Sequence, residues 1–158
     1  MVDAVNAGQP YFSEPDLDML LRAATTLGKL RATSRPEPAD AFVIAVPTPF
    51  NADRSPNLDY IDAAVDAIAP VLAAGNVVIL ESTSPVGTTR NVVGRILSES
   101  GMEPGRDFDL CYCPERVLPG NTTHELVNNH RLIGGVTPQS ADHAQQIYER
   151  FAQGKIVT

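Results

Sequence analysis

The chain has 158 residues, of which 43% are hydrophobic, so a globular fold with its own core is expected rather than disorder. The formal net charge of −7 argues against a general binder of nucleic acids or anionic membranes, because both need a basic surface. No apolar stretch approaches the roughly 20 residues that span a bilayer, and Met1–Gly8 lacks the pattern of a signal peptide. These features predict a cytoplasmic protein without a membrane or nucleic-acid partner.

The first part of the chain gives one clear helical signal. Residues 1–13 have no pattern. A helix is expected to begin at Glu14-Pro15-Asp16, because proline is tolerated in the first turn and acids favour the positive helix end. Gly28 ends this helix, Lys29–Thr33 could form a short strand, and Ser34–Pro38 forms a turn. The apolar face of the helix consists of Leu17, Leu20, Leu21 and Ala24.

From residue 41 onward, short apolar runs alternate with helical patterns. Buried strands are expected over Ala41–Val46, Val77–Leu80 and Phe108–Tyr112, a further strand or edge segment over Arg131–Gly135, and a last strand from Ile156. Between them, helical spacing predicts helices over 58–72, 88–100, 123–128 and from Thr137-Pro138 to Gly154. This order predicts an α/β domain with a mostly parallel sheet and helices on both faces.

Three of the predicted strands run out into short polar motifs. These motifs are Val46-Pro-Thr-Pro49, Glu81-Ser-Thr-Ser-Pro85 and Cys113-Pro-Glu-Arg116. Ligands of open parallel sheets bind beyond the carboxyl ends of the strands. If the strands are parallel neighbours, all three motifs lie on one rim, which is the predicted site.

The threonines of these motifs are candidate ligand contacts. The hydroxyls of Thr48 and Thr83 suit the ribose and carboxamide groups of a dinucleotide. They could equally cap the next helix or turn the chain. Thr88 and Thr89 open a helix, where a threonine usually acts as a cap, although the same amide-rich end could hold a phosphate.

The charged residues near the rim have two readings. Glu115 follows a strand directly and could activate water or take a proton from an alcohol, or it could form an ion pair with Arg116 or Arg131. Arg116 could clamp a sugar hydroxyl or a phosphate with its fork of donors. Arg90 and Arg131 are expected to be solvated.

The cysteines and histidines suggest no metal site. Cys111 and Cys113 should point the same way along a strand, as reduced residues of the core. The three histidines show no metal-binding spacing with each other or with the cysteines.

Four motifs, AFVIAVPTPF, VILESTSPVGTT, YCPERVLPGN and HRLIGG, resemble those of the UDP-glucose/GDP-mannose dehydrogenase family in order and spacing. Together with EPDLDMLLRAA they look most like its UDP-N-acetyl-D-mannosamine dehydrogenase subgroup, and the similarity covers nearly all of residues 14–158. The resemblance implies a Rossmann-like fold. It also implies a two-step, NAD-linked oxidation of the C6 alcohol of a UDP-sugar to a carboxylate, through an aldehyde and a cysteine thioester. The complete enzyme is expected to be a homo-oligomer.

The resemblance also assigns roles to residues. Pro119 occupies the position where some members have a second glutamate, so a two-glutamate mechanism is not expected. Thr83 matches a position near the nicotinamide and the catalytic water, and Glu115 matches a glutamate linked to hydrolysis or proton transfer. The matched NAD contacts are Thr48 and Thr89, and the matched substrate contacts are Arg116 and Val117.

Other parts of the family pattern are missing from the sequence. There is no G-x-G-x-x-G turn, so the first β-α-β unit of the fold is expected to be absent. The family's nucleophilic cysteine lies in a later motif, and neither Cys111 nor Cys113 falls in it. The chain therefore reads as a single partial NAD-binding domain without the central helix and the UDP-binding domain. The alternatives are an inactive standalone nucleotide-binding or assembly module, and a relic without a ligand.

Overall fold

The computed structural model describes residues 1–158, which form two compact units. The larger unit comprises residues 36–115, 130–151 and 155–158. The smaller unit comprises residues 1–35, 116–129 and 152–154. No helix in the structure is both long enough and apolar enough to cross a membrane.

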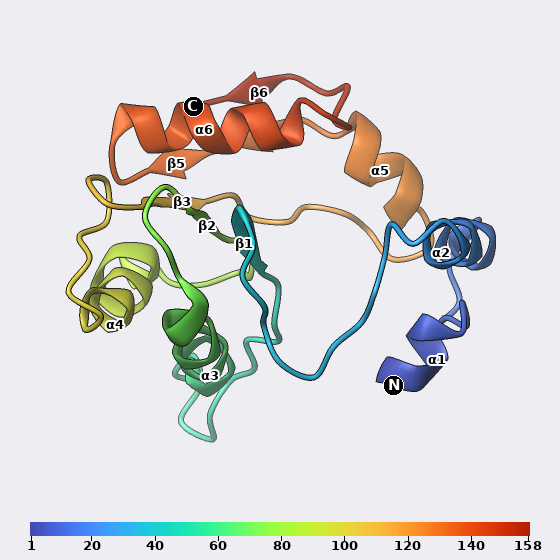
Figure 1. The fold of residues 1–158 in the computed structure, drawn as a ribbon, viewed down its shortest axis with the longest axis horizontal. Helices are drawn as coiled ribbons and strands as arrows, with labels where there is room; N and C mark the ends of the chain where they lie inside the picture. The colour runs from blue at the N-terminus through green and yellow to red at the C-terminus, as the bar shows by residue number, and fades with distance from the viewer. The chain divides into compact units, whose positions relative to one another are not determined.

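A four-stranded sheet forms the centre of the larger unit (Figure 1). Its strands are β1 (Ala41–Ile44), β2 (Val77–Leu80), β3 (Asp109–Tyr112) and β5 (Gly134–Gly135), in the order β1-β2-β3-β5. The first three strands run parallel, and β5 pairs antiparallel with β3. A separate parallel pair joins β4 (Arg131–Leu132) to β6 (Ile156–Val157).

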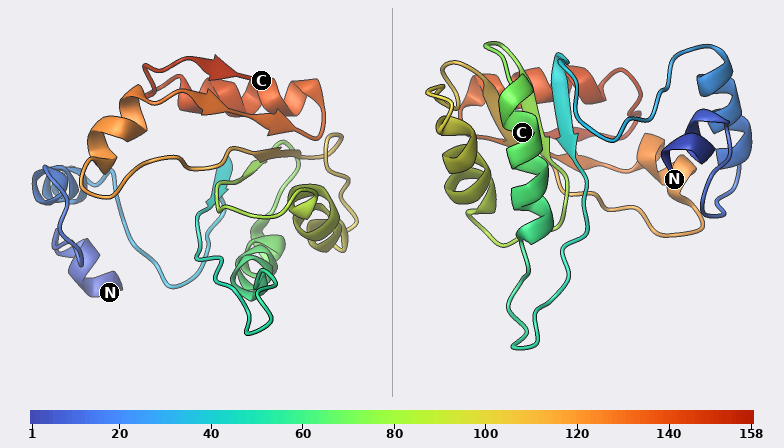
Figure 2. Two further views of the ribbon diagram at one scale, coloured as in Figure 1. Left: turned by 180° about the vertical axis from the view of Figure 1, so that it is seen from behind. Right: turned by 60° about the horizontal axis from the view of Figure 1, so that its bottom comes forward.

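Helices cover both faces of this sheet, as the alternation of strand side chains requires. One face of β2 and β3 packs against α3 (Asp59–Ile68), the 3₁₀ turn η1 (Ala69–Val71), the π-helical segment η2 (Thr89–Gly94) and α4 (Arg95–Ser98). The opposite face packs against α6 (Pro138–Tyr148). The left view of Figure 2 shows α6 on one side of the sheet and α3 and α4 on the other. The first core includes Ile61, Val65, Val78, Leu80, Leu97 and Leu110; the second includes Val77, Ile79, Cys111, Ala141 and Ala144.

The smaller unit contains α1 (Val2–Asn6), α2 (Leu17–Thr26) and α5 (Thr122–Asn128). None of these three helices has a buried side chain, so hydrogen bonds between distant segments hold much of the unit in place. The Asn6 side chain both donates to and accepts from the backbone of Ala32. The Glu14 carboxylate accepts the backbone N–H of Gly120 at 2.8 Å.

Most of the predicted elements are present. The predicted strand Val77–Leu80 has the observed bounds, and Thr137 caps α6 by accepting the Ser140 N–H at 3.1 Å. The sheet is mostly parallel with helices on both faces, as predicted. Helix α6 ends at Tyr148, before the predicted stop at Gly154.

Two predictions about strands were wrong. Lys29–Thr33 is not a strand, because the backbone of Leu30 turns back to Ala24 at the end of α2 and that of Ala32 bonds to a side chain. Arg131–Gly135 is not one strand but two, β4 and β5, which belong to different sheets. Ile133, which separates them, is buried.

The two glycines of β5 give a matched test of this packing. A Cβ atom on Gly135 would collide with the Thr137 carbonyl oxygen and lie 2.5 Å from the Ala141 nitrogen, whereas a Cβ atom on Gly134 would meet nothing within 4 Å. Gly135→Ala should therefore lower the free energy of unfolding by roughly 1–3 kcal/mol, and Gly134→Ala should change it little. Urea denaturation of the two variants checks this. Equal effects would contradict the described contact between β5 and α6.

Candidate functional site

The carboxyl ends of the three parallel strands lie level with one another. Ile44 is paired with Leu80, and Leu80 with Tyr112. Backbone hydrogen bonds continue past these ends: Glu81 donates to Ile44 at 2.9 Å, and Glu115 donates to Glu81 at 3.2 Å. The three polar motifs therefore leave the sheet at one edge, as the sequence predicted.

Ser82 fastens two of these motifs together. Its hydroxyl accepts the Val46 N–H at 2.7 Å and lies 2.8 Å from the Val46 carbonyl oxygen, to which it can donate. Ser82 is only 7% exposed, so these hydrogen bonds are shielded from water. They hold the Pro47-Thr48-Pro49 turn against the end of β2.

The predicted cofactor-binding threonines all reach the surface of the larger unit. Thr83 is exposed, and Thr48 and Thr89 are half-buried. Thr88, the neighbour of Thr89, is buried at 4% exposure and makes no capping hydrogen bond through its side chain. The prediction that the Thr88 side chain caps the helix is therefore wrong. A role of Thr48, Thr83 and Thr89 toward a cofactor stays a prediction.

A cavity of about 330 Å³ lies beside Thr89 on this side of the sheet. The loop after β2 forms one wall, and β5 with the residue that follows it forms another. The Arg90 guanidinium donates to the Val136 carbonyl oxygen at 3.4 Å and joins the two walls. Arg90 is otherwise exposed, as predicted.

Two carboxylates and one arginine form a cluster on the α6 side of the rim. Arg131 Nη1 lies 3.9 Å from Glu81 Oε1 and 3.7 Å from Glu115 Oε2. The Tyr148 hydroxyl donates to Glu81 Oε1 at 2.6 Å. Arg131 is only 6% exposed, so the expectation of a solvated Arg131 was wrong. Glu115 does form an ion pair, which was one of its two predicted roles.

Burial controls the ionisation of this cluster. It raises the pKa of the Glu81 carboxyl; the Tyr148 hydrogen bond opposes this rise, the Glu115 charge adds to it, and the Arg131 charge opposes it. Burial and the hydrogen bond to Glu81 raise the pKa of Tyr148, so this phenol remains a hydrogen-bond donor near neutral pH. The cluster therefore holds a carboxyl group that ionises less readily than a solvated glutamate.

Sequence reasoning named an ion pair of Glu115 with Arg131 as one alternative, but it missed Glu81 and Tyr148 as members of the same site. One available signal was the alternation of side chains along a strand. Counting by two from Cys111 leads to Glu115, and counting by two from Ile79 leads to Glu81, so both glutamates should face the α6 side. The position of Arg131 could not be read in this way, because β4 belongs to another sheet.

The cysteines are core residues, as predicted. Cys111 and Cys113 are free thiols, both 0% exposed. The Cys111 thiol donates to the Ser140 carbonyl oxygen at 3.0 Å, and burial raises its pKa to about 12. Burial also raises the pKa of Cys113. Neither side chain has the accessible thiolate that a nucleophile requires.

The predicted substrate contacts Arg116 and Val117 lie in the smaller unit, directly after Glu115 in the chain. Arg116 is exposed, and Val117 is half-buried. The loop that they begin is ordered within this unit, because the Glu125 carboxylate accepts the Leu118 N–H at 2.9 Å. Their contact with a substrate stays a prediction.

Comparison with known proteins gives a consistent family assignment. Residues 1–152 match the model described as "UDP-glucose/GDP-mannose dehydrogenase family, NAD binding domain". The chain is 50% identical to an NDP-N-acetyl-D-galactosaminuronic acid dehydrogenase of Ralstonia nicotianae, over 99% of this chain and 38% of that protein. It is 48% identical to the UDP-N-acetyl-D-mannosamine dehydrogenase of Campylobacter jejuni, over 99% of this chain and 40% of that protein.

Solved structures agree with the sequence matches. The UDP-N-acetyl-mannosamine dehydrogenase of Staphylococcus aureus superposes with a TM-score of 0.94 at 39% identity, over 99% of this chain and 38% of that chain. The corresponding enzyme of Pyrococcus horikoshii gives a TM-score of 0.94 at 38% identity, over 98% and 38%. The chain thus spans about two fifths of the length of these relatives.

Replacement of Ser82 tests how the rim is fastened. Ser82→Ala removes the hydroxyl that accepts the Val46 N–H, so this amide should exchange with solvent at least about tenfold faster, for a lost bond of roughly 1.4 kcal/mol or more. Hydrogen exchange followed by NMR measures this rate. Ser84→Ala, two residues along the same loop, is the control. An unchanged Val46 rate would show that the turn does not depend on Ser82.

The buried thiols predict low chemical reactivity. Cys111 and Cys113 should react with a disulfide reagent such as Ellman's reagent only when the protein unfolds, because both are shielded and protonated at neutral pH. The rate of thiol modification, with and without denaturant, checks this. Rapid labelling of either thiol in the folded protein would contradict their core position.

Proposed function

Because the chain belongs to the UDP-glucose/GDP-mannose dehydrogenase family and matches its NAD-binding domain, we propose that it is part of an NAD-dependent UDP-sugar 6-dehydrogenase. The proposed substrate is UDP-N-acetyl-D-mannosamine, and the proposed reaction oxidises its C6 alcohol to the uronic acid. One observation carries this proposal: three aligned strand ends present hydroxyl and carboxylate groups at one edge.

The residues at this edge suit part of a dinucleotide. Thr48, Thr83 and Thr89 offer hydroxyls that reach the surface, and such groups can bond to ribose hydroxyls and to a carboxamide. The Ser82 hydrogen bonds keep the Thr48 turn in place before a ligand arrives, which favours binding by preorganisation. When bound, NAD accepts the hydride removed from C6.

Glu115 is the proposed acid–base group. It follows β3 at the rim, and its side chain is 30% exposed, so it can reach both the protein interior and a ligand. In the ionised form it can take the proton of an alcohol or hold a water molecule for hydrolysis. Arg116 and Val117 are proposed to contact the sugar, as the family motif implies.

The covalent step is proposed to use a cysteine outside this chain. Both cysteines of the chain are fully buried, and the pKa of each is raised. A thioester on either would require the strand that carries it to leave the core. The 158-residue polypeptide alone is therefore proposed to bind NAD without completing the oxidation.

The names of the relatives support the proposed sugar. The matched relatives named above are dehydrogenases of 2-acetamido sugar nucleotides, named for mannosamine or for galactosaminuronic acid. We propose the mannosamine form because several relatives at 43–48% identity carry that name.

The proposed location is the cytoplasm. The two buried free thiols suit its reducing conditions.

NAD titration of the chain tests this proposal. Amide NMR signals around Thr48, Thr83 and Thr89 should shift saturably with NAD at millimolar concentration. The double replacement of Thr48 and Thr89 by valine should weaken binding by about 5- to 150-fold, if each lost hydroxyl bond contributes roughly 0.5–1.5 kcal/mol. Thr26→Val, in the exposed part of α2, is the control. The chain with NAD and UDP-N-acetyl-D-mannosamine should show no sustained rise in NADH absorbance.

Either of two results would contradict the proposal. An absence of saturable NAD shifts, or shifts that map away from the three motifs, would remove the cofactor role. Sustained NADH formation by the chain alone would refute the need for an outside cysteine. Comparison with UDP-N-acetylgalactosamine in the complete enzyme would then decide between the two sugar assignments.

A further inference from the structure

We infer that Arg131 is a positioning residue for Glu115, and that Glu81 and Tyr148 complete a buried network that sets the orientation of the Glu115 carboxylate. This inference rests on the proposed role of Glu115. The residues come from four places in the larger unit: Glu81 after β2, Glu115 after β3, Arg131 in β4 and Tyr148 at the end of α6.

The alternation of side chains along the strands sets the direction of both glutamates. Ile79 and Cys111 face the core beneath α6, and residues two and four positions further along an extended strand face the same way. Glu81 and Glu115 therefore enter the α6 side of the sheet rather than bulk water. The side chain of Glu81 is 15% exposed and that of Glu115 is 30% exposed.

Arg131 is buried among groups that compensate its charge. A buried guanidinium is costly unless charges and hydrogen bonds compensate it. Arg131 lies within 4 Å of both carboxylates, and its guanidinium carbon lies 4.5 Å from the centre of the Tyr148 ring and 5.3 Å from that of Phe151. Both rings lie within cation–π distance of the guanidinium, whose planar fork of donors lysine lacks.

Backbone and core contacts of the larger unit hold Arg131 and Tyr148 in place. The Arg131 N–H donates to the Lys155 carbonyl oxygen at 2.9 Å, which ties β4 to β6. Tyr148 is 3% exposed, and α6 packs on the sheet through Ala141 and Ala144. A fixed cation beside a catalytic carboxylate keeps that carboxylate from sampling other rotamers, which is how a supporting contact improves a reacting group.

The positive and negative charges of the network are unequal in number. One guanidinium faces two carboxylates, so the network carries an excess negative charge when both are ionised. The groups that face Glu81 are Arg131, Glu115, Tyr148 and the Cys113 thiol. Because the pKa of Glu81 is raised in the folded protein, its ionisation lowers stability as the pH rises above about 4.5, the value for a free side chain. The pKa of Glu81 therefore responds to the charges of Arg131 and Glu115.

The test uses NMR of the chain with carboxyl-labelled glutamate, without NAD or sugar. Arg131→Met should raise the pKa of Glu81 by about one unit, because it removes the neighbouring positive charge. Glu115→Gln should lower it by about half a unit, because it removes a neighbouring negative charge. Arg131→Lys should leave the pKa of Glu81 largely unchanged, because the positive charge remains. It should lower the order of the Glu115 side chain, which NMR relaxation measures. Glu81→Gln assigns the Glu81 signal.

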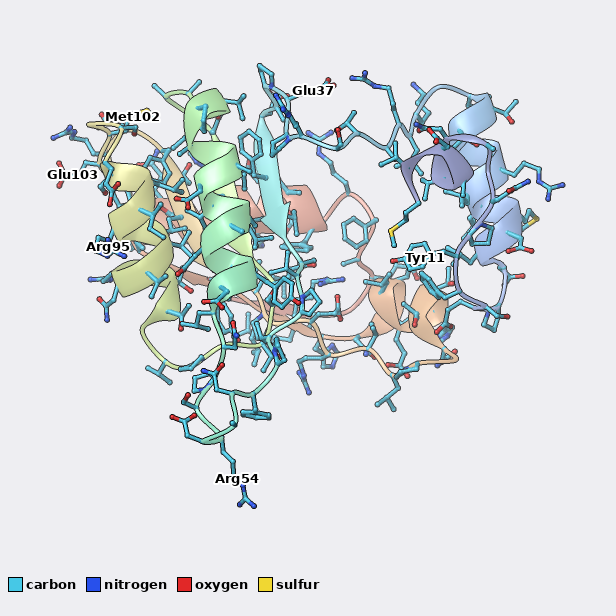
Figure 3. The ribbon with its side chains drawn as sticks, turned by 90° about the horizontal axis from the view of Figure 1, so that it is seen from below. Tyr11, Glu37, Arg54, Arg95, Met102 and Glu103 are labelled. Carbon is cyan, nitrogen blue, oxygen red and sulfur yellow. The ribbon has the colours of Figure 1, made fainter.

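The control is Arg95→Met, which removes an arginine that pairs with Glu99 on the surface. Figure 3 shows Arg95 directed outward from α4. This variant should change neither the Glu81 titration nor the Glu115 order. If Arg131→Met does not fold, Arg131→Lys and Glu115→Gln decide the question.

Two outcomes would overturn the inference: a Glu81 pKa that does not respond to Glu115→Gln, or a Glu115 side chain equally ordered with lysine at position 131. Neither readout needs a cofactor. A failed NAD titration would therefore contradict the proposed function without contradicting the network. A Glu81 titration that does not respond to Glu115→Gln would contradict the network without contradicting NAD binding.

Discussion

The common register of β1, β2 and β3 is the constraint on which the site depends. Ile44, Leu80 and Tyr112 are paired across the sheet, so the residues that follow them emerge at one height. Had one strand slipped by a single residue, its side chains would have exchanged faces and its polar end would have moved along the rim. Such a slip is costly in β2, because all of its residues are buried and a slip would bring the neighbouring Glu81 into the fully buried stretch. Core packing thereby fixes the positions of groups that themselves contribute little to stability.

The same alternation explains how charged groups come to lie against the core. Polar side chains begin where the strands end, but the two-residue period continues into Glu81 and Glu115. These glutamates lie above the second core, next to the side of α6 that carries Tyr148. Arg131 then offsets their charge from a separate two-stranded sheet. A buried ion cluster of this kind is weak support for stability, because desolvation cancels much of its Coulomb energy. The cluster is better explained as a means of fixing the orientation of the Glu115 side chain.

Much of the fold was predictable because its signals are local. The run Val77–Leu80 and the Thr137 cap each depend on neighbouring residues, and both were predicted correctly. The common rim also followed from local motifs plus one topological rule. The failures involve contacts between distant residues. Lys29–Thr33 has the composition of a strand but no partner strand, and Asn6 bonds to its backbone instead. Arg131 looked solvated because its aromatic and acidic neighbours lie 16 or more positions away in the sequence, at Tyr148, Glu115 and Glu81.

The distribution of reactive groups also constrains how the chemistry can be divided. Glutamate is useful at the rim because its protonation can change with its surroundings, and Glu115 sits between an ion pair and solvent. Thiols are useful only as accessible thiolates, and the thiols of this chain are packed between the sheet and α6. A covalent step at Cys111 or Cys113 would break the core that sets the strand register, and with it the rim. Proton handling and hydride orientation are therefore compatible with this fold, whereas nucleophilic attack by its cysteines is not. In the proposed reaction, a nucleophile must therefore reach the rim from residues other than Cys111 and Cys113.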